Sequence, residues 1–193
     1  MTHEPIAVIG EALVDIVEGG ETHPGGSPMN IAVGLARLGH PTVLHTRIGS
    51  DPHGDAVRAH LDAAGVELGP GTVVPGRTST ATARLDAEGK AEYDFDIDWD
   101  IAVPDIAGAR AVHTGSIGAL REPGAAAVLA ALGAAGSDTL RTLDPNIRPD
   151  VIGERDEVLR RVVELTALCP VVKLSDEDAA WLVPGAPLEE VLA

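Results

Sequence analysis

The residues GGSPMNIAVGLARLG, numbered 25 to 39, carry the strongest structural signal in this 193-residue sequence. Two glycines precede a helical pattern, Ser27 is expected to cap the helix, and Pro28 fits the first turn, where a missing N–H costs little. Asn30 follows within the same turn. Bare glycine backbone before a helix N-terminus lets a small polar ligand approach unpaired N–H groups. The stretch therefore predicts a ligand-binding turn; an ordinary tight turn before a helix is the alternative.

The composition limits the classes of function. Apolar residues make up 45% of the chain and aromatic residues only 2%, so the core must consist of Ala, Val, Leu and Ile. The net charge of −16 argues against nucleic acid and anionic membranes as partners. Cys169 is the only cysteine, which excludes an intrachain disulfide. Because Glu11 and Asp15 interrupt the N-terminal apolar run, we expect no signal peptide or membrane span and a soluble, cytoplasmic protein.

Strand and helix patterns alternate along most of the chain. Strands are expected at residues 6–17 (broken near Gly10), 42–48, 110–113, 139–144 and 171–174, and helices at 28–38, 51–64, 123–135, 154–167 and 176–182. Such alternation predicts an α/β fold with a Rossmann-like parallel sheet and flanking helices in one main domain. Two further strands, 78–86 and 91–99, joined by a turn at 87–90, form a hairpin outside this sheet.

Polar residues follow two of the predicted strands. Asp15 ends the first strand pattern, and ligands of parallel sheets gather at strand carboxyl ends, where a carboxylate accepts hydrogen bonds from sugar hydroxyls. The loop DPNIRP, residues 144–149, places an anion, an amide and a cation (Asp144, Asn146 and Arg148) between two prolines. The alternatives are a solvated aspartate at a strand end and a rigid turn before a helix.

Two patterns imitate other kinds of site. Four aspartates alternate with apolar residues over 93–100, but a calcium loop would need glycine where Trp99 stands and glutamate where Asp105 stands. The alternation instead predicts a strand with Tyr93, Phe95 and Trp99 on one face. The chain has no Walker A sequence and no GxGxxG, and its seven histidines show no metal-ligand spacing, so His45, His53 and His113 are interpreted as packing or surface residues.

The glycine pair at 25–26, with Asn30, Ala32, Gly39 and Gly49 at their intervals, resembles the N-terminal signature of the PfkB (ribokinase-like) carbohydrate kinases. The resemblance implies transfer of the γ-phosphoryl group of ATP to a sugar hydroxyl, with Mg²⁺ neutralising charge. Three segments together favour a fructokinase-like enzyme: GEALVD (residues 10–15), DPNIRP (144–149) and KLSDED (173–178). Ketodeoxygluconate, ribose or nucleoside kinases of the same superfamily are the alternatives.

The same resemblance implies roles for particular residues. Those expected to bind the sugar are Asp15, Gly25, Gly26, Asn30, Phe95 and Arg148. Those expected in the phosphate and Mg²⁺ region are Asn146, Lys173, Ser175 and Asp178, with no direct metal ligand assigned. Ser175 and Asp178 stand where the family segment has Asn and Glu, and a capped helix start is the alternative for them. The hairpin, within about 72–100, is implied to be a lid over the sugar and a homodimer contact.

The resemblance covers only the front part of such a kinase, so residues 1–193 are expected to be an incomplete ribokinase-like domain. The family's catalytic motif opens a helix, whereas GAAGSD at 133–138 closes one and is interpreted as a helix C-terminal turn. The catalytic base is therefore expected beyond Ala193, and the chain alone is expected to be inactive. A non-catalytic sugar-binding or regulatory module and a nonfunctional gene fragment are the remaining alternatives.

Overall fold

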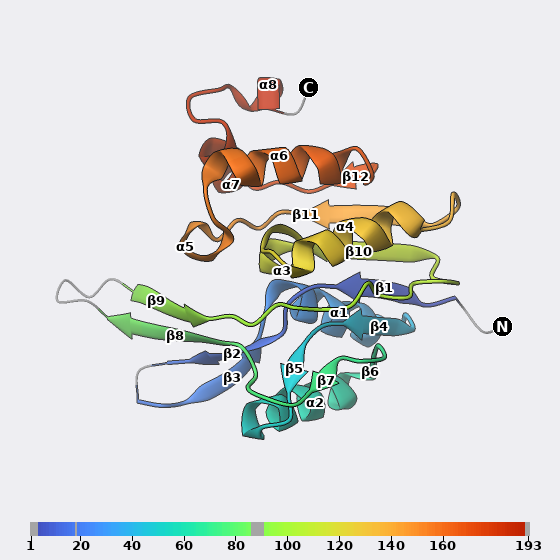
Figure 1. Ribbon diagram of the computed structural model, residues 1–193, viewed down its shortest axis with the longest axis vertical. Helices are drawn as coiled ribbons and strands as arrows, with labels where there is room; N and C mark the ends of the chain where they lie inside the picture. Colours follow the sequence, from blue (N-terminus) through green and yellow to red (C-terminus); the bar gives the residue numbers. More distant parts are fainter. Residues whose placement is uncertain (1–3, 18, 86–90, 192–193) are drawn as a thin grey trace.

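The computed structural model describes residues 4–17, 19–85 and 91–191, and its centre is a six-stranded parallel sheet (Figure 1). Every neighbouring pair of its strands runs parallel, as the alternation of strands and helices predicts. In spatial order the strands are β12 (Val171–Val172), β11 (Leu140–Asp144), β10 (Ala111–Gly115), β1 (Ile6–Ile9), β4 (Thr42–His45) and β6 (Val66–Leu68). The predicted α/β class is confirmed.

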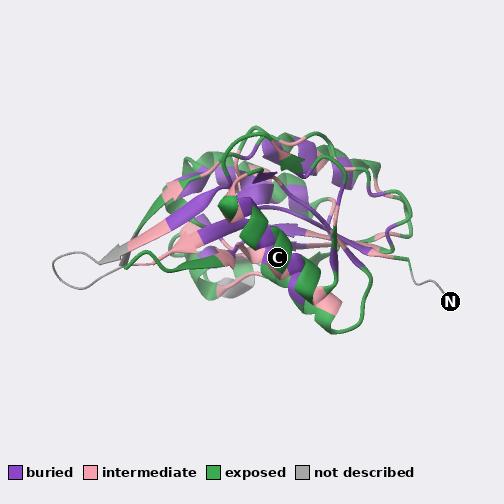
Figure 2. Ribbon diagram, turned by 90° about the horizontal axis from the view of Figure 1, so that it is seen from below, coloured by how far each residue is buried: buried purple, intermediate pink, exposed green. Residues whose placement is uncertain are grey.

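Helices cover both faces of this sheet. On one face Val8 of β1 packs with residues of α1 (Ser27–Arg37) and α2 (Pro52–Ala64). On the other, Ala7 and Ile9 pack with α3 (Ser116–Leu120), α4 (Gly124–Ala134) and α6 (Arg155–Thr166). Because side chains of a strand alternate between faces, one short strand serves both cores, which are almost wholly aliphatic. Figure 2 shows buried segments running through the middle of the fold. Three short helices complete the order: α5 (Pro149–Ile152), α7 (Asp176–Leu182) and α8 (Leu188–Val191).

A second sheet of four strands adjoins the first. Its order is β3 (Thr22–Gly25), β2 (Leu13–Ile16), β8 (Thr80–Leu85) and β9 (Ala91–Asp96). The predicted break near Gly10 is confirmed, and it separates β1 and β2, which belong to different sheets. Gly10 lies at the change of direction, where a Cβ would come within 2.2 Å of the Pro28 ring. Two strands of two residues, β5 (Ile48–Gly49) and β7 (Val73–Val74), pair separately.

The β8–β9 hairpin has the two-faced pattern that its sequence predicts. Thr80 pairs with Asp96 and Leu85 with Ala91 in an antiparallel register. Phe95, Ile97 and Trp99 pack against the core, whereas the aspartates between them are exposed. The predicted turn at 87–90 lies outside the described residues. A strand, and not a calcium loop, accounts for the alternation.

The hairpin is expected to open and close more readily than the central sheet. In hydrogen-exchange experiments, amides of β8 and β9 should exchange faster than those of β1, because every residue of β1 is buried whereas Tyr93, Asp94 and Asp96 of β9 are exposed. Addition of the sugar that the PfkB resemblance implies should slow exchange in the hairpin. Protection equal to that of β1 in the free protein would contradict a lid.

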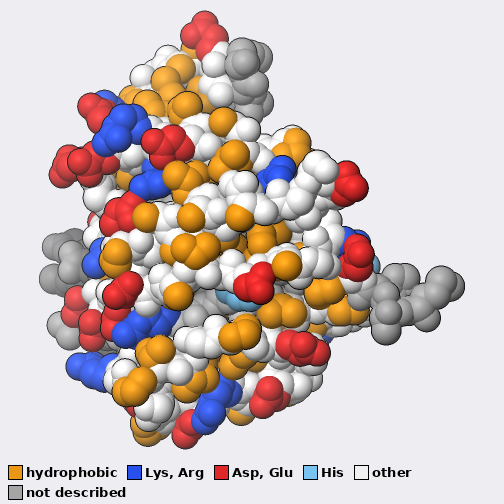
Figure 3. Space-filling model, turned by 45° about the vertical axis from the view of Figure 1, so that its right-hand side comes forward, with side chains coloured by type: hydrophobic (Ala, Val, Ile, Leu, Met, Phe, Trp, Pro, Cys, Tyr) orange, Lys and Arg blue, Asp and Glu red, His pale blue; other side chains and the backbone are white. Residues whose placement is uncertain are grey.

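The surface and the helix lengths bear on possible membrane contact. Acidic and basic side chains are interspersed with apolar ones over the face seen in Figure 3. None of the helices in the described part of the chain combines the length and apolarity needed to cross a membrane.

Candidate functional site

A cavity of about 620 Å³ lies between the second sheet, the start of α1 and the loop that follows β11. It brings together five of the six residues predicted to bind sugar, namely Asp15, Gly26, Asn30, Phe95 and Arg148. Asn146, predicted for the phosphate region, also lines it. These residues come from segments more than 130 positions apart in the sequence, so the fold, and not local spacing, creates the site.

The start of α1 differs in detail from its prediction. Gly26 is the N-cap, with φ 110°, and Ser27 is already the first helical residue without a side-chain cap, so the predicted Ser27 cap is wrong. The physical reason is that the chain turns from β3 into the helix through a conformation that favours glycine. A Cβ on Gly26 would lie 2.7 Å from the carbonyl oxygen of Glu11. The bare backbone at Gly26 is therefore a steric requirement.

Asp15 lines the cavity from a different strand position than the sequence predicts. It lies in β2 of the second sheet, opposite His23 of β3, and not at the carboxyl end of a strand of the main sheet. Gly25, the sixth predicted residue, makes room for it, because a Cβ there would stand 2.1 Å from Asp15 Oδ2. Burial raises the pKa of Asp15, and the nearby His23 opposes that rise.

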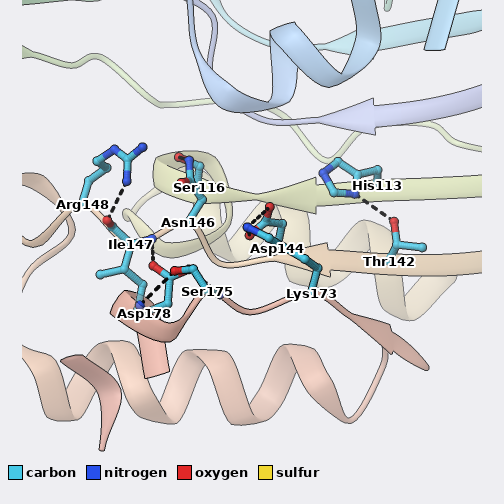
Figure 4. A network of polar contacts seen from close by, with 10 residues as sticks. All are labelled: His113, Ser116, Thr142, Asp144, Asn146, Ile147, Arg148, Lys173, Ser175 and Asp178. Atoms are coloured by element: carbon cyan, nitrogen blue, oxygen red, sulfur yellow. Dashed lines mark hydrogen bonds and ion pairs between the residues drawn. The ribbon is translucent and has the colours of Figure 1, made fainter. Parts of the chain in front are cut away.

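The two loops predicted to serve the phosphate region contact each other (Figure 4). Lys173 Nζ lies 3.1 Å from Asp144 Oδ2, and the amide of Ile147 donates to Asp178 Oδ1 at 2.7 Å. A second cavity of about 380 Å³ lies between the loops, and Asn146 lines both cavities. The DPNIRP and KLSDED segments therefore line a second cavity that adjoins the one with the predicted sugar residues.

Ser175 and Asp178 form a capping box at the start of α7. Ser175 Oγ accepts from the Asp178 amide at 3.0 Å, and Asp178 Oδ2 accepts from the Ser175 amide at 3.3 Å. Asp178 is only 5% exposed, and both of its oxygens have partners. The capped helix start, given as the alternative for these two residues, is thus observed. Their part in the phosphate and Mg²⁺ region stays a prediction.

Backbone strain is concentrated at the edge of the cavity. Among the described residues, the non-glycine positions with positive φ are Ser116 (53°) and Asn146 (38°). The two are joined, because Asn146 Nδ2 donates to Ser116 Oγ at 3.4 Å (Figure 4). Such conformations cost about 1–3 kcal/mol each and cluster at functional sites. Ser116 was not among the residues predicted from sequence.

Glu11 is a second residue of the cavity that the sequence did not single out. Its side chain is 3% exposed, and Oε2 accepts from the Gly118 amide at 2.8 Å. Burial raises its pKa to about 7, while hydrogen bonds from Gly118, Ser116 and Ser27 oppose the rise. The sequence signal that could have found Glu11 is an acid inside an otherwise apolar strand pattern. Such an acid is expected to be buried with a shifted pKa, and acids with strongly shifted pKa values cluster at functional sites.

The raised pKa of Glu11 predicts a pH-dependent stability. Its folded pKa of about 7 lies above the ordinary 4.5, so its contribution is full below pH 4.5 and is lost as the pH rises to 7. Relative to Glu11→Gln, the wild type should lose roughly 3 kcal/mol of unfolding free energy over that interval. Denaturant unfolding of both proteins at several pH values checks this, and parallel stability curves would contradict it.

Asp138 and His113, which the sequence does not place in the ligand site, lie outside the 620 Å³ cavity. Asp138 follows α4 and precedes β11, at the amino-terminal edge of the sheet, where it lines a separate cavity of about 480 Å³. The interpretation of residues 133–138 as a helix C-terminal turn is confirmed. His113 shares a 2.9 Å hydrogen bond between Nδ1 and Thr142 Oγ1, and burial lowers its pKa (Figure 4). Within the described residues, no cluster of three or more His, Cys, Asp or Glu side chains is placed to hold a metal ion.

The parallel sheet, the second sheet and the cavity between them define a ribokinase-like α/β architecture, and known proteins share it. Residues 5–193 match the model of the pfkB family carbohydrate kinases, and the chain belongs to that family. It is 30% identical to a fructokinase of Vibrio alginolyticus, covering 96% of this chain and 64% of the relative. It is 33% identical to a fructokinase of Klebsiella pneumoniae, covering 92% and 62%.

Solved structures agree with the sequence relatives. Fructokinase of Xylella fastidiosa with bound ATP superposes with a TM-score of 0.84 at 26% identity, over 98% of this chain and 67% of that one. Fructokinase of Vibrio cholerae O395 in apo form gives 0.82 at 26% identity, over 99% and 70%. The chain spans less than two thirds of the length of the curated relatives named above.

Proposed function

We propose that this chain is the sugar-binding portion of an ATP-dependent carbohydrate kinase, which transfers the γ-phosphoryl group of ATP to a sugar hydroxyl. The observation that carries the proposal is the 620 Å³ cavity in which Asp15, Asn30 and Arg148 meet. Carboxylate and amide groups suit the hydroxyls of a sugar, which both donate and accept hydrogen bonds. The volume lies in the range of small-molecule sites.

Fructose is the proposed substrate. The relatives in Vibrio alginolyticus and Klebsiella pneumoniae are fructokinases, and one structure of the Vibrio cholerae O395 enzyme holds fructose and ADP. Calorimetric titration with fructose, ribose, ketodeoxygluconate and a nucleoside separates this substrate from the other members of the superfamily. A non-catalytic sugar-binding module would bind sugar in the same experiment and produce no phosphorylated product in any longer form of the protein.

ATP and Mg²⁺ are the proposed cofactors, and the residues present fit the nucleotide better than the metal. Lys173 is exposed beside the second cavity and suits a phosphate group. Asp178, by contrast, is buried and hydrogen-bonded to two amides, so we assign no direct Mg²⁺ ligand to it. We place the catalytic base outside these residues, since Asp138 lies at the opposite edge of the sheet and Asp144 is paired with Lys173.

We further propose that residues 1–193 form an incomplete ribokinase-like domain and that the hairpin within 72–100 closes over the sugar. Tyr93 and Phe95 line the cavity from β9, with ring centroids 5.9 Å apart. Tyr93 is 52% exposed, so closure over a ligand would cover it. Contact between two copies through the hairpin belongs to the same proposal, and sedimentation analysis of the chain tests it.

Replacing Asp15 with Ala is expected to weaken fructose binding by about one to two orders of magnitude, because a lost hydrogen bond to a charged group costs roughly 1.5–3 kcal/mol. Isothermal titration calorimetry measures the effect. Asp94→Ala is the matched control, since Asp94 is an exposed aspartate of the neighbouring hairpin that does not line the cavity. Equal affinity of wild type and Asp15→Ala would remove Asp15 from the site.

A further inference from the structure

We propose that Glu11 is a positioning residue, which holds the glycine turn at the start of α1 and the DPNIRP loop in one arrangement around the sugar. The proposal rests on the proposed function and adds to it a residue that does not itself need to contact the substrate. It follows from three observations: the convergence of three backbone segments, the donors on the Glu11 carboxylate, and the link from Ser116 to Asn146.

Three backbone segments meet at Glu11 more closely than side chains would allow. A Cβ on Gly118, in α3, would lie 2.5 Å from the Cα of Gly10. A Cβ on Gly26 would lie 2.7 Å from the carbonyl oxygen of Glu11 and 3.3 Å from the Cα of Ala12. The β1–β2 junction, the start of α1 and the start of α3 therefore touch through bare backbone, and a small displacement of one segment must move the others.

The Glu11 carboxylate joins these segments. Oε2 accepts from the Gly118 amide at 2.8 Å, and Ser27 and Ser116 are near enough for hydrogen bonding to lower the pKa of the same carboxyl. One side chain thus hydrogen-bonds to the third residue of α3 and lies beside the first residue of α1 and the first residue of α3. An ionised carboxylate has acceptors for all of these donors, whereas a glutamine amide replaces one acceptor with two N–H donors.

The link continues to the opposite wall of the cavity. Asn146 Nδ2 donates to Ser116 Oγ at 3.4 Å, and Ser116 precedes Gly118, whose amide donates to Glu11, within the same short helix. Both Ser116 and Asn146 have positive φ, so these hydrogen bonds stabilise a strained backbone at the base of the DPNIRP loop. Glu11 therefore connects the sugar-binding turn with the loop that carries Arg148.

The test compares fructose affinity, by isothermal titration calorimetry at pH 8, for the 193-residue wild type, Glu11→Gln, Ser116→Ala and the double variant. Glu11→Gln should bind fructose roughly tenfold more weakly, the effect of one charged hydrogen bond. Ser116→Ala should give a smaller loss, and the double variant should be no worse than Glu11→Gln, because both changes break the same chain of bonds. Glu67→Gln, an exposed carboxylate on β6, is the matched control and should bind like the wild type.

Two further measurements separate positioning from general stability. The unfolding midpoint of Glu11→Gln should be equal to or above that of the wild type at pH 8, because the variant buries no charge. In Glu11→Ala, added formate should restore fructose affinity by supplying a carboxylate, and chloride at the same ionic strength should not. Any one of three results would overturn the proposal. The first is weaker fructose binding that comes with an equal loss of unfolding free energy, and the second is additive effects of Glu11→Gln and Ser116→Ala. The third is no rescue of Glu11→Ala by formate.

Amide exchange tests the positioning role of Glu11 without any sugar. The amide of Gly118 should exchange faster in Glu11→Ala than in the wild type without any sugar, and the side-chain amide of Asn146 should change its NMR shift. If the wild type binds no sugar but these changes occur, the proposed substrate is wrong and the positioning role stands. If the wild type binds fructose and Glu11→Gln binds it equally well, the positioning role is wrong and the proposed function stands.

Discussion

Mixed with ATP, Mg²⁺ and fructose, the 193-residue chain is expected to release no ADP above the rate without sugar. A positioned general base contributes roughly 10²–10⁴-fold to the rate of such a reaction, and one anion-hole donor roughly 10²–10³-fold. Neither Asp138 nor Asp144 is placed to act as the base, because the first lies at the far edge of the sheet and the second is paired with Lys173. The chain should therefore bind fructose without catalysing ADP formation.

A coupled assay of ADP formation measures this, with the fructokinase of Vibrio cholerae O395 under identical conditions as the positive control. Fructose titration of the same protein sample shows whether its sugar site is intact. Turnover that depends on fructose and persists after repeated purification would contradict the prediction. It would require a base within residues 1–193, and Asp144→Asn would then be the first variant to examine.

The parallel sheet could be predicted from sequence because its signals are local. Apolar runs of strand length, such as Ile6–Ile9, alternate with helical patterns that carry their own start and stop residues. At α2, predicted over 51–64, such residues are observed: the Asp51 carboxylate accepts from the Gly54 amide at 2.8 Å, and Gly65 ends the helix with φ 78°. Such signals need no knowledge of distant partners.

The second sheet could not be fully predicted because distant pairing decides it. The apolar patterns of β1 and β2 are alike, yet β1 pairs with β4 and β10 while β2 pairs with β3 and β8. The strand β3, with the sequence THPG, reads as a turn. It is an edge strand, and proline is tolerated there because no further strand needs its missing N–H.

Some residues of the candidate site could be predicted from local motifs, and others could not. Asp15, Asn30 and Asn146 were predicted from motifs, and the structure places all three at one cavity. Glu11 was not, because its importance comes from burial and from a hydrogen bond to Gly118, 107 residues away. A motif shows which residue types are present; it does not show which carboxylate is surrounded by amides.

Replacing Gly26 with Ala is expected to weaken fructose binding by about a hundredfold, equivalent to about 2.7 kcal/mol. At φ 110° a Cβ is strained, and its nearest neighbours are backbone atoms of Glu11 and Ala12 at 2.7 and 3.3 Å. Backbone cannot rotate away as a side chain can, so the start of α1, and Asn30 with it, must shift. The strain should also lower the unfolding free energy by about 1–3 kcal/mol.

The same helix provides a matched control, and the comparison decides whether the glycine at position 26 serves the site or only the helix. A Cβ on Gly34 meets no heavy atom within 4 Å, so Gly34→Ala should stabilise the helix by up to about 1 kcal/mol and leave fructose binding unchanged. Calorimetric binding and thermal unfolding of both variants measure the contrast. If Gly26→Ala binds fructose as well as Gly34→Ala does, the turn at Gly26 does not form the sugar site, because a displacement of its backbone would then have no consequence for the ligand.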